Sequence, residues 1–263
     1  MSVTPSTELS IAHRSAGTGP PQLVFVHGWA GSGVSYDETI AALDLDRVRA
    51  TSLDLSGHGD SPGRDGEWTL DRIDDEILSV MDAISVERAV LLGYSMGGKF
   101  VQHFALRHPD RVAGLIPVAG TQASSMKIPD EMLESWYAGA GNAEAMKDMV
   151  RLFLTGPVDE TVLNRFAREA ARVSLQALKG TMRVTLDTDF SGELASLDVP
   201  TLVVVGRRDE FMTVDLLRNT IASKIRGARM VILDCGHEIP LERPHELATL
   251  IEAFLAGGGE PHR

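Results

Sequence analysis

The sequence predicts an α/β fold in which a mostly parallel sheet is flanked by helices and interrupted by a helical insertion. Three short runs of aliphatic and β-branched residues, at 23–26, 90–92 and 201–205, each lead into a glycine-containing turn. Such runs are typical of strands that are buried on both faces of a sheet. Segments with apolar residues at helical spacing lie between the runs, and strands that alternate with helices favour a parallel sheet.

Weaker signals of the same kind predict the rest of the sheet and its helices. The further predicted strands are 48–54, 112–118 and 230–234. The predicted flanking helices are 70–84, 96–107 and 244–255. Residues 8–14 precede a turn rich in glycine and proline at 17–21, and we expect them to add an antiparallel edge strand.

Residues 121–190 break the alternation, because they contain no convincing strand. Half of the ten methionines occur in this block, and we expect most of them in its own core and a few beside a pocket. We expect a core domain of residues 1–120 and 191–263, a helical cap at 121–190, and a disordered tail from residue 257. The helices predicted within the cap are 130–137, 143–154, 159–171 and 175–184.

Composition and charge exclude several classes of protein. Hydrophobic residues make up 43% of the chain, which is too apolar for a disordered protein, and the net charge of −12 argues against nucleic acid as a partner. No apolar run approaches the roughly 20 residues of a membrane helix, and residues 1–14 lack the apolar segment of a secretory signal. We therefore expect a cytoplasmic protein without a membrane partner. The one cysteine, Cys235, is expected to be a buried filler, and it rules out an internal disulfide and a thiolate zinc site.

The segment Gly93-Tyr94-Ser95-Met96-Gly97 lies between a predicted strand and a predicted helix. A serine nucleophile must project from a very sharp turn at the end of a strand, and glycines two residues to either side let the neighbouring backbone approach. Gly93 and Gly98-Lys99 also have the spacing of a phosphate-binding loop, but Phe100 stands where that loop needs Ser or Thr. The pattern therefore predicts that Ser95 is a nucleophile.

A serine nucleophile requires a base and an acid that orients the base. His237 follows the predicted strand 230–234, and Gly236 before it frees the backbone to turn the imidazole inward. Asp209 follows the strand 201–205 and is the predicted acid, with Glu210 as the neighbouring alternative. The resulting chain order is Ser95, Asp209, His237.

The serine also needs donors for the negative charge that develops on the substrate oxygen. His27-Gly28-Trp29 directly follows the strand 23–26. The backbone N–H groups of Trp29 and Met96 are the predicted oxyanion donors. We expect His27 to brace this loop rather than to titrate during the reaction.

These pieces, in this order, resemble the α/β-hydrolase fold superfamily over nearly the whole chain. The turn at 54–61, the Val199-Pro200 pair and the segment Glu242-Arg243-Pro244 are also similar to the family's pattern. The resemblance implies catalytic roles for Ser95, Asp209 and His237, oxyanion donors on Trp29 and Met96, and a helical cap. Haloalkane dehalogenases and epoxide hydrolases of this fold use an aspartate as nucleophile and are set aside, whereas carboxylesterases, enol-lactone hydrolases, perhydrolases and carbon–carbon hydrolases remain.

Substrate contacts are less well defined by the sequence. The candidates are Lys99, Trp136 and Tyr137. The menaquinone-pathway lyase of this fold has an arginine at the position of Lys99, but an ordinary exposed helix residue is the favoured interpretation here. Arg165, Arg168 and Arg172 share one face of a predicted helix. Such a row is usually solvated, with Glu160 and Glu169 as partners, and carboxylate binding is the alternative.

The sequence therefore predicts a serine hydrolase that cleaves a small carboxylic ester or lactone through an acyl-enzyme on Ser95, with no metal and no organic cofactor. Two alternatives remain open. One is a carbon–carbon hydrolase or lyase that uses the same triad on a dicarbonyl acid, and the other is a ligand receptor with vestigial hydrolysis. The acyl and alcohol groups, the conformation of the cap and the oligomeric state are left open.

Overall fold

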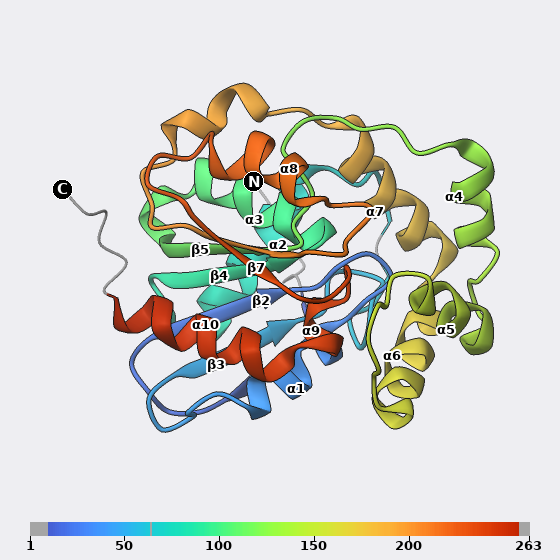
Figure 1. Cartoon of the computed structure of the whole chain (residues 1–263), viewed down its shortest axis with the longest axis horizontal. Helices are drawn as coiled ribbons and strands as arrows, with labels where there is room; N and C mark the ends of the chain where they lie inside the picture. Colours follow the sequence, from blue (N-terminus) through green and yellow to red (C-terminus); the bar gives the residue numbers. More distant parts are fainter. Residues whose placement is uncertain (1–9, 64, 258–263) are drawn as a thin grey trace, which may run out of the picture.

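The computed structural model describes residues 10–63 and 65–257 and contains one seven-stranded sheet (Figure 1). The strand order is β1-β3-β2-β4-β5-β6-β7, with β1 antiparallel to β3 and the other neighbours parallel. The mostly parallel sheet predicted from the sequence is thus confirmed, with the antiparallel edge strand displaced to residue 13 and beyond. The strands are β1 His13–Ala16, β2 Gln22–Val26, β3 Arg49–Leu53, β4 Ala89–Tyr94, β5 Val112–Val118, β6 Leu202–Gly206 and β7 Arg229–Leu233. Residues 8 and 9 of the predicted edge strand, and most of the predicted tail, lie outside the described residues.

Helices flank the sheet on both faces. The longer ones match the predicted segments within a few residues, whereas the helices of four or five residues were not predicted, because so short a segment carries no periodic signal. The α-helices of the sheet region are α1 Asp37–Ala41, α2 Leu70–Ala83, α3 Met96–Arg107, α8 Val214–Leu217, α9 Ile239–Glu242 and α10 Pro244–Ala256. Short 3₁₀ segments are η1 Gly33–Tyr36, η2 Pro109–Arg111 and η3 Ser191–Ser196, and η4 Arg218–Ala222 is a π-helical turn.

The sheet separates two apolar cores. Side chains of a strand alternate between faces, so Leu23 and Phe25 of β2 pack in one core while Val24 and Val26 pack in the other. Residues of α10 complete the first core, and residues of α2 and α3 complete the second. Since both faces are covered, the central strands must be apolar throughout, which is why they read as uninterrupted aliphatic runs.

The chain between β5 and β6 forms four helices that gather on one side of the molecule (Figure 1). These are α4 Asp130–Tyr137, α5 Ala143–Arg151, α6 Glu160–Arg172 and α7 Leu175–Asp187. Side chains of Asn142, Asp159 and Ser174 accept hydrogen bonds from the first-turn N–H groups of α5, α6 and α7, so each of these helices begins at a capping residue. Met146, Val150 and other apolar residues form a third, smaller core among them.

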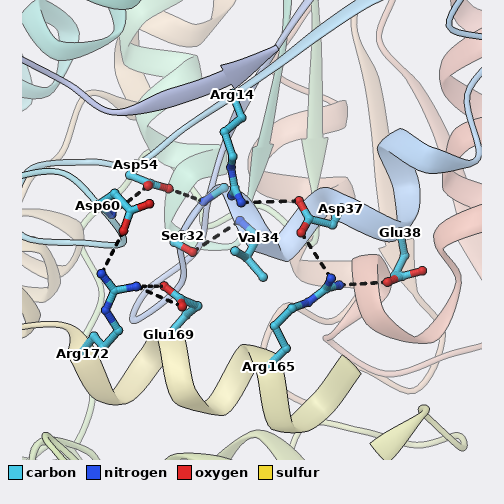
Figure 2. A network of polar contacts seen from close by, with 11 residues as sticks. Arg14, Ser32, Val34, Asp37, Glu38, Asp54, Asp60, Arg165, Glu169 and Arg172 are labelled. Atoms are coloured by element: carbon cyan, nitrogen blue, oxygen red, sulfur yellow. Dashed lines mark hydrogen bonds and ion pairs between the residues drawn. The ribbon is translucent and has the colours of Figure 1, made fainter. Parts of the chain in front are cut away.

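Ion pairs join α6 to the sheet region (Figure 2). Arg165 lies 2.8 Å from Glu38 and 3.4 Å from Asp37, and Arg172 lies 2.9 Å from Asp60. Arg172 also pairs with Glu169, as the sequence predicts. Glu160 pairs with Lys147 and Arg151 instead of with the predicted row of arginines on α6. Exposed pairs of this kind contribute at most about 1 kcal/mol each. Their main effect is therefore to fix where α6 sits.

Among the residues that the structure describes, no helix combines the length and the apolar character needed to span a bilayer.

Candidate active site

Ser95 occupies the turn between β4 and α3 in a backbone conformation that non-glycine residues rarely adopt. Its φ is 49° and its ψ is −117°. The turn is held by three backbone hydrogen bonds, from Ser95 N–H to the Val118 carbonyl and from the N–H groups of Gly98 and Thr121 to the Ser95 carbonyl. Strain of this kind persists only where the surroundings enforce it, and it is concentrated at functional sites.

The glycines around Ser95 are required by close approach of the backbone. A Cβ on Gly93 would lie 2.2 Å from the Gly97 carbonyl oxygen, and a Cβ on Gly97 would lie 2.3 Å from the Val26 carbonyl oxygen. Neither contact can be relieved by a side-chain rotation, because the atoms that are met belong to the backbone. The spacing of glycines in the sequence therefore reflects close packing within this turn, at Gly93, and of the turn against β2, at Gly97.

His237 lies within hydrogen-bonding distance of both other predicted triad residues. The Ser95 Oγ is 2.9 Å from His237 Nε2, and His237 Nδ1 is 2.7 Å from Asp209 Oδ2. The other oxygen of Asp209 accepts hydrogen bonds from the backbone N–H groups of Phe211 and Met212, which fix the orientation of the carboxylate. The arrangement lets Ser95 give its proton to His237 while Asp209 holds the imidazole.

The electrostatic environment of His237 and Asp209 favours the charged form of the His237 imidazole. Burial lowers the pKa of His237, but the hydrogen bond and charge of Asp209, together with the charges of Glu238 and Glu242, outweigh burial and bring the pKa above its usual value of 6.5. Burial likewise raises the pKa of Asp209, but its hydrogen bonds to His237 and to backbone N–H groups bring the pKa below 3.8. Asp209 is therefore a carboxylate at neutral pH, available to stabilise a protonated His237.

The loop that carries His237 is tied to the chain after α5. The backbone N–H of His237 donates to the Phe153 carbonyl at 3.1 Å. The Glu242 carboxylate accepts the N–H of Gly236 through one oxygen and the N–H and hydroxyl of Thr155 through the other. We did not predict this bridging role of Glu242. Its only signal in the sequence was the resemblance of the segment 242–244 to a family pattern.

One predicted oxyanion donor, Met96, directly follows Ser95, and the loop that leads to the other, Trp29, packs against Ser95. Met96 is the first residue of α3, so its N–H has no carbonyl within the helix to bind. No acceptor for the N–H of Trp29 is found within residues 10–63 and 65–257. A Cβ on Gly28 would lie 3.2 Å from the Cβ of Ser95, so the loop before Trp29 packs directly against the serine.

His27 braces that loop, as we expected. Its Nε2 accepts the N–H of Leu55 at 3.0 Å, and its Nδ1 donates to the Gly28 carbonyl at 2.8 Å. Burial lowers the pKa of His27 to about 4, although the bond to Gly28 acts in the opposite direction. The ring is therefore neutral, and its two hydrogen bonds account for both nitrogens.

A cavity of about 320 Å³ opens onto Ser95 and His237. Its wall is mainly apolar, with side chains from the four helices α4 to α7 and from the loop after β6. Trp136 lines the cavity, whereas Tyr137 does not and instead packs against Trp29 and Lys179. The apolar residues of the wall include Met126, Ile128, Met132, Met149, Phe153, Phe166, Met182, Leu186, Phe211 and Met212.

Lys99 differs from the sequence prediction. Its side chain is fully buried, and its Nζ donates to three backbone carbonyls, those of Ser124, Thr185 and Thr188. The three donors of the ammonium are used in this way, and Lys99 is absent from the wall of the cavity. The prediction of an exposed residue is therefore wrong. Its ammonium ties α3 to the C-terminal end of α7 and is not placed to hold a substrate carboxylate.

Replacing Lys99 with methionine is expected to lower the free energy of unfolding by about 2–4 kcal/mol, because three carbonyls, one of them fully buried, lose their donor while the side-chain volume is nearly kept. Urea denaturation of the wild type and the variant measures this difference. Lys224, an exposed lysine, supplies the control Lys224→Met, for which a change within about 0.5 kcal/mol is expected. Equal stabilities of the two variants would contradict the role assigned to Lys99.

Side chains spaced like metal ligands occur away from Ser95. In the described part of the chain, one such group consists of Asp71 and Asp74 of α2 and His103 of α3, with ligand atoms within 4.8 Å of one another. His103 and Asp74 already form a hydrogen bond of 2.8 Å, and Asp71 is exposed. The group lies outside the wall of the cavity that contains the triad.

Known proteins resemble this chain in both sequence and structure. A family model described as "alpha/beta hydrolase fold" matches residues 21–168. A pimeloyl-[acyl-carrier protein] methyl ester esterase from Aeromonas hydrophila is 28% identical over 94% of this chain and 100% of its own length. A 2-hydroxy-6-oxononadienedioate/2-hydroxy-6-oxononatrienedioate hydrolase from Burkholderia vietnamiensis is 25% identical over 96% of this chain and 93% of its own length. The crystal structure of a hydrolase from Pseudomonas aeruginosa superposes with a TM-score of 0.81 at 26% identity, covering 95% of this chain and 99% of that one.

Proposed function

Because this chain belongs to the α/β-hydrolase fold family, we propose that it is a serine hydrolase that cleaves a carboxylic ester or lactone through an acyl-enzyme on Ser95. The observation that carries the proposal is the pair of contacts of His237, 2.9 Å to the Ser95 hydroxyl and 2.7 Å to Asp209. The esterase among its relatives, which aligns over 94% of the chain, supports the same class of reaction.

In the proposed reaction, the Ser95 Oγ attacks the carbonyl carbon of the substrate and its proton passes to His237 Nε2. The carbonyl oxygen becomes negatively charged and is held by the N–H groups of Trp29 and Met96, each worth on the order of 3 kcal/mol. The tetrahedral intermediate expels the alcohol, which takes the proton from His237. A water molecule then loses a proton to His237 and attacks the acyl carbon. The acid is released when His237 returns this proton to the Ser95 Oγ.

Residues 121–190 would act in this scheme as a cap. Helices α4 to α7 supply much of the apolar wall above Ser95, and the ion pairs of Arg165 and Arg172 hold α6 against the sheet region. A cap of this kind excludes bulk water from the cavity and thereby strengthens the electrostatic contacts at Ser95.

Hydrolysis of short p-nitrophenyl esters, together with labelling by a fluorophosphonate, tests the proposal. We expect turnover of the esters and covalent labelling of Ser95, located by mass spectrometry of the digested protein. A fluorophosphonate needs an activated serine but no specific substrate, so labelling separates a wrong choice of ester from the absence of the triad chemistry. A folded wild type that neither labels nor turns over would rule the proposal out.

The rate of ester hydrolysis is expected to rise with pH through the pKa of His237, which lies above 6.5 because Asp209 stabilises the imidazolium. Only the neutral imidazole can accept the serine proton, so activity is low below this pKa and reaches a plateau above it. The measurement is kcat/KM for an uncharged ester from pH 5 to 9. A midpoint below 6.5 would contradict the assigned environment of His237.

Carbon–carbon bond hydrolysis of a dicarbonyl acid is a second candidate, favoured by the relative of that name from Burkholderia vietnamiensis. Such a substrate carries carboxylates, and the charged side chains of the cavity wall are Glu210, Glu238 and Lys127. Two of these three are acids, which favours an uncharged ester over a dianion. Turnover of a dienedioate with negligible turnover of esters would select this second candidate instead.

A further inference from the structure

Methionine is the commonest residue in the wall of the cavity that contains Ser95. Six of the ten methionines of the chain line this cavity. They come from six separate segments of the chain, so no single helix accounts for them. These residues, which we call the methionine wall, are Met96, Met126, Met132, Met149, Met182 and Met212.

The side chain of methionine gives such a wall an unusual property. It is unbranched, rotates about three bonds and ends in a polarisable thioether, so it fits irregular gaps and adapts to different partners. Leucine has nearly the same volume, but it is branched and has fewer rotamers. The methionine wall can therefore adjust to groups of different shape, whereas a wall of leucines would favour one shape.

The polar side chains of the cavity wall are engaged elsewhere or lie at the surface. The Thr185 hydroxyl donates to a carbonyl of its own helix, and the Glu238 carboxyl shares a hydrogen bond with the Tyr94 hydroxyl. Lys127 and Glu210 are both exposed. Away from the triad, the inner wall thus presents mainly apolar surface. A charged group of a substrate would lose its hydration there without gaining an ionic partner.

The volume of the cavity limits the size of the group that it can hold. The cavity measures about 320 Å³. At the roughly 30 Å³ that one water molecule occupies in the liquid, this space holds on the order of ten non-hydrogen atoms. Met132 and Phe211 border the cavity and are exposed, so atoms beyond this number would reach the solvent.

We propose that the methionine wall determines specificity by holding an apolar, uncharged group of the substrate, which it selects by size and not by shape. The inference rests on the proposed ester hydrolysis and names the class of substrate: an ester of a medium-length apolar acid or alcohol, straight or branched. Each methylene that enters the cavity leaves water, and this transfer supplies the binding free energy.

Two series of esters test the size limit, one on each side of the scissile bond. Methyl esters of straight-chain acids run from methyl acetate to methyl decanoate, and acetates of straight-chain alcohols run from methyl acetate to decyl acetate. In at least one series we expect kcat/KM to rise about two- to fourfold per methylene as far as methyl heptanoate or hexyl acetate, which fill the cavity. Beyond that length the gain should end.

Isomers of one composition test the tolerance of shape. Methyl heptanoate, methyl 5-methylhexanoate and methyl 4,4-dimethylpentanoate differ only in the branching of the acyl chain. Hexyl, 4-methylpentyl and 3,3-dimethylbutyl acetate differ in the same way on the alcohol side. In the series that shows the gain, we expect the wild type to hydrolyse the three isomers within about threefold of one another in kcat/KM. Replacing both Met149 and Met182 with leucine should widen this spread to about tenfold or more.

Met146→Leu is the matched control. Met146 lies on the same helix as Met149 and is fully buried, but it packs among the helices of the cap outside the cavity wall. Its replacement should therefore keep the tolerance of the wild type. The readout is the ratio between isomers within one variant, so a change in the amount of active enzyme does not affect it.

The inference fails if neither series shows a gain with chain length, or if the wild type separates the three isomers by tenfold or more. It also fails if the double leucine variant keeps the tolerance of the wild type. Labelling of Ser95 by a fluorophosphonate distinguishes these results from a failure of the proposed function. A wild type that labels but shows no gain with length refutes the inference alone, whereas one that resists the label and hydrolyses no ester refutes the proposed function.

Discussion

Replacing Ser95 with alanine is expected to lower kcat for ester hydrolysis by about 10⁴- to 10⁶-fold, because the nucleophile of the proposed acyl-enzyme is lost. Alanine keeps the Cβ, so the backbone strain at φ 49° and the hydrogen bonds of the turn are preserved. The variant should therefore fold like the wild type and fail to label with a fluorophosphonate. Steady-state kinetics with active-site titration measures both effects.

Ser196→Ala is the matched control for this experiment. Ser196 is exposed at the end of η3 and lies outside the cavity wall, so its removal should leave kcat within about twofold of the wild type. Substantial activity in Ser95→Ala, say within tenfold of the wild type, would mean that another group attacks the substrate.

Replacing Asp209 with asparagine is expected to lower kcat by about 10³- to 10⁴-fold while leaving the cavity intact. Asparagine has nearly the same shape, but its amide lacks the charge that stabilises the imidazolium. Its NH₂ can also force His237 to present a protonated nitrogen to Ser95. Because Asp209 raises the pKa of His237, the pH midpoint of the residual activity should also move down.

An aspartate that follows the neighbouring strand β7 provides the control for the Asp209→Asn substitution. Asp234 is largely exposed and pairs with Arg208, so Asp234→Asn should retain activity and the wild-type pH midpoint. A small effect of Asp209→Asn, or an unchanged pH midpoint, would show that the contact between Asp209 and His237 does not orient the base.

Much of the fold was predictable because its signals are local. Each buried strand is an apolar run, and α2, α3 and α10 show helical spacing of apolar residues. The turn at Ser95 was predictable for a similar reason, since its steric demands fix glycines at 93 and 97. The triad required one further step, which was to place His237 and Asp209 at the carboxyl ends of parallel strands that meet at one edge of the sheet.

The features that were missed depend on segments far apart in the chain. Lys99 is buried because carbonyls of Ser124 and of the end of α7 surround its ammonium, and nothing in the local sequence of α3 reports those partners. The same holds for Arg165, whose partner Glu38 lies 127 residues away. A glutamate such as Glu238 is usually exposed, so its burial beside the serine had no sequence signal.

The uneven attachment of the four helices has a consequence for how molecules reach the serine. Helix α6 is anchored to the sheet region by Arg165 and Arg172. The chain at 153–155 is anchored by Glu242 and by the N–H of His237, so displacing this chain would also disturb the loop that carries His237. Helix α4, which lies wholly within the described part of the chain, buries none of its residues. Met132 of α4 and Phe211 both border the cavity and are exposed to the surface. We therefore expect substrate to enter and product to leave beside Met132, where helix α4 can move without disturbing the hydrogen bonds of the triad.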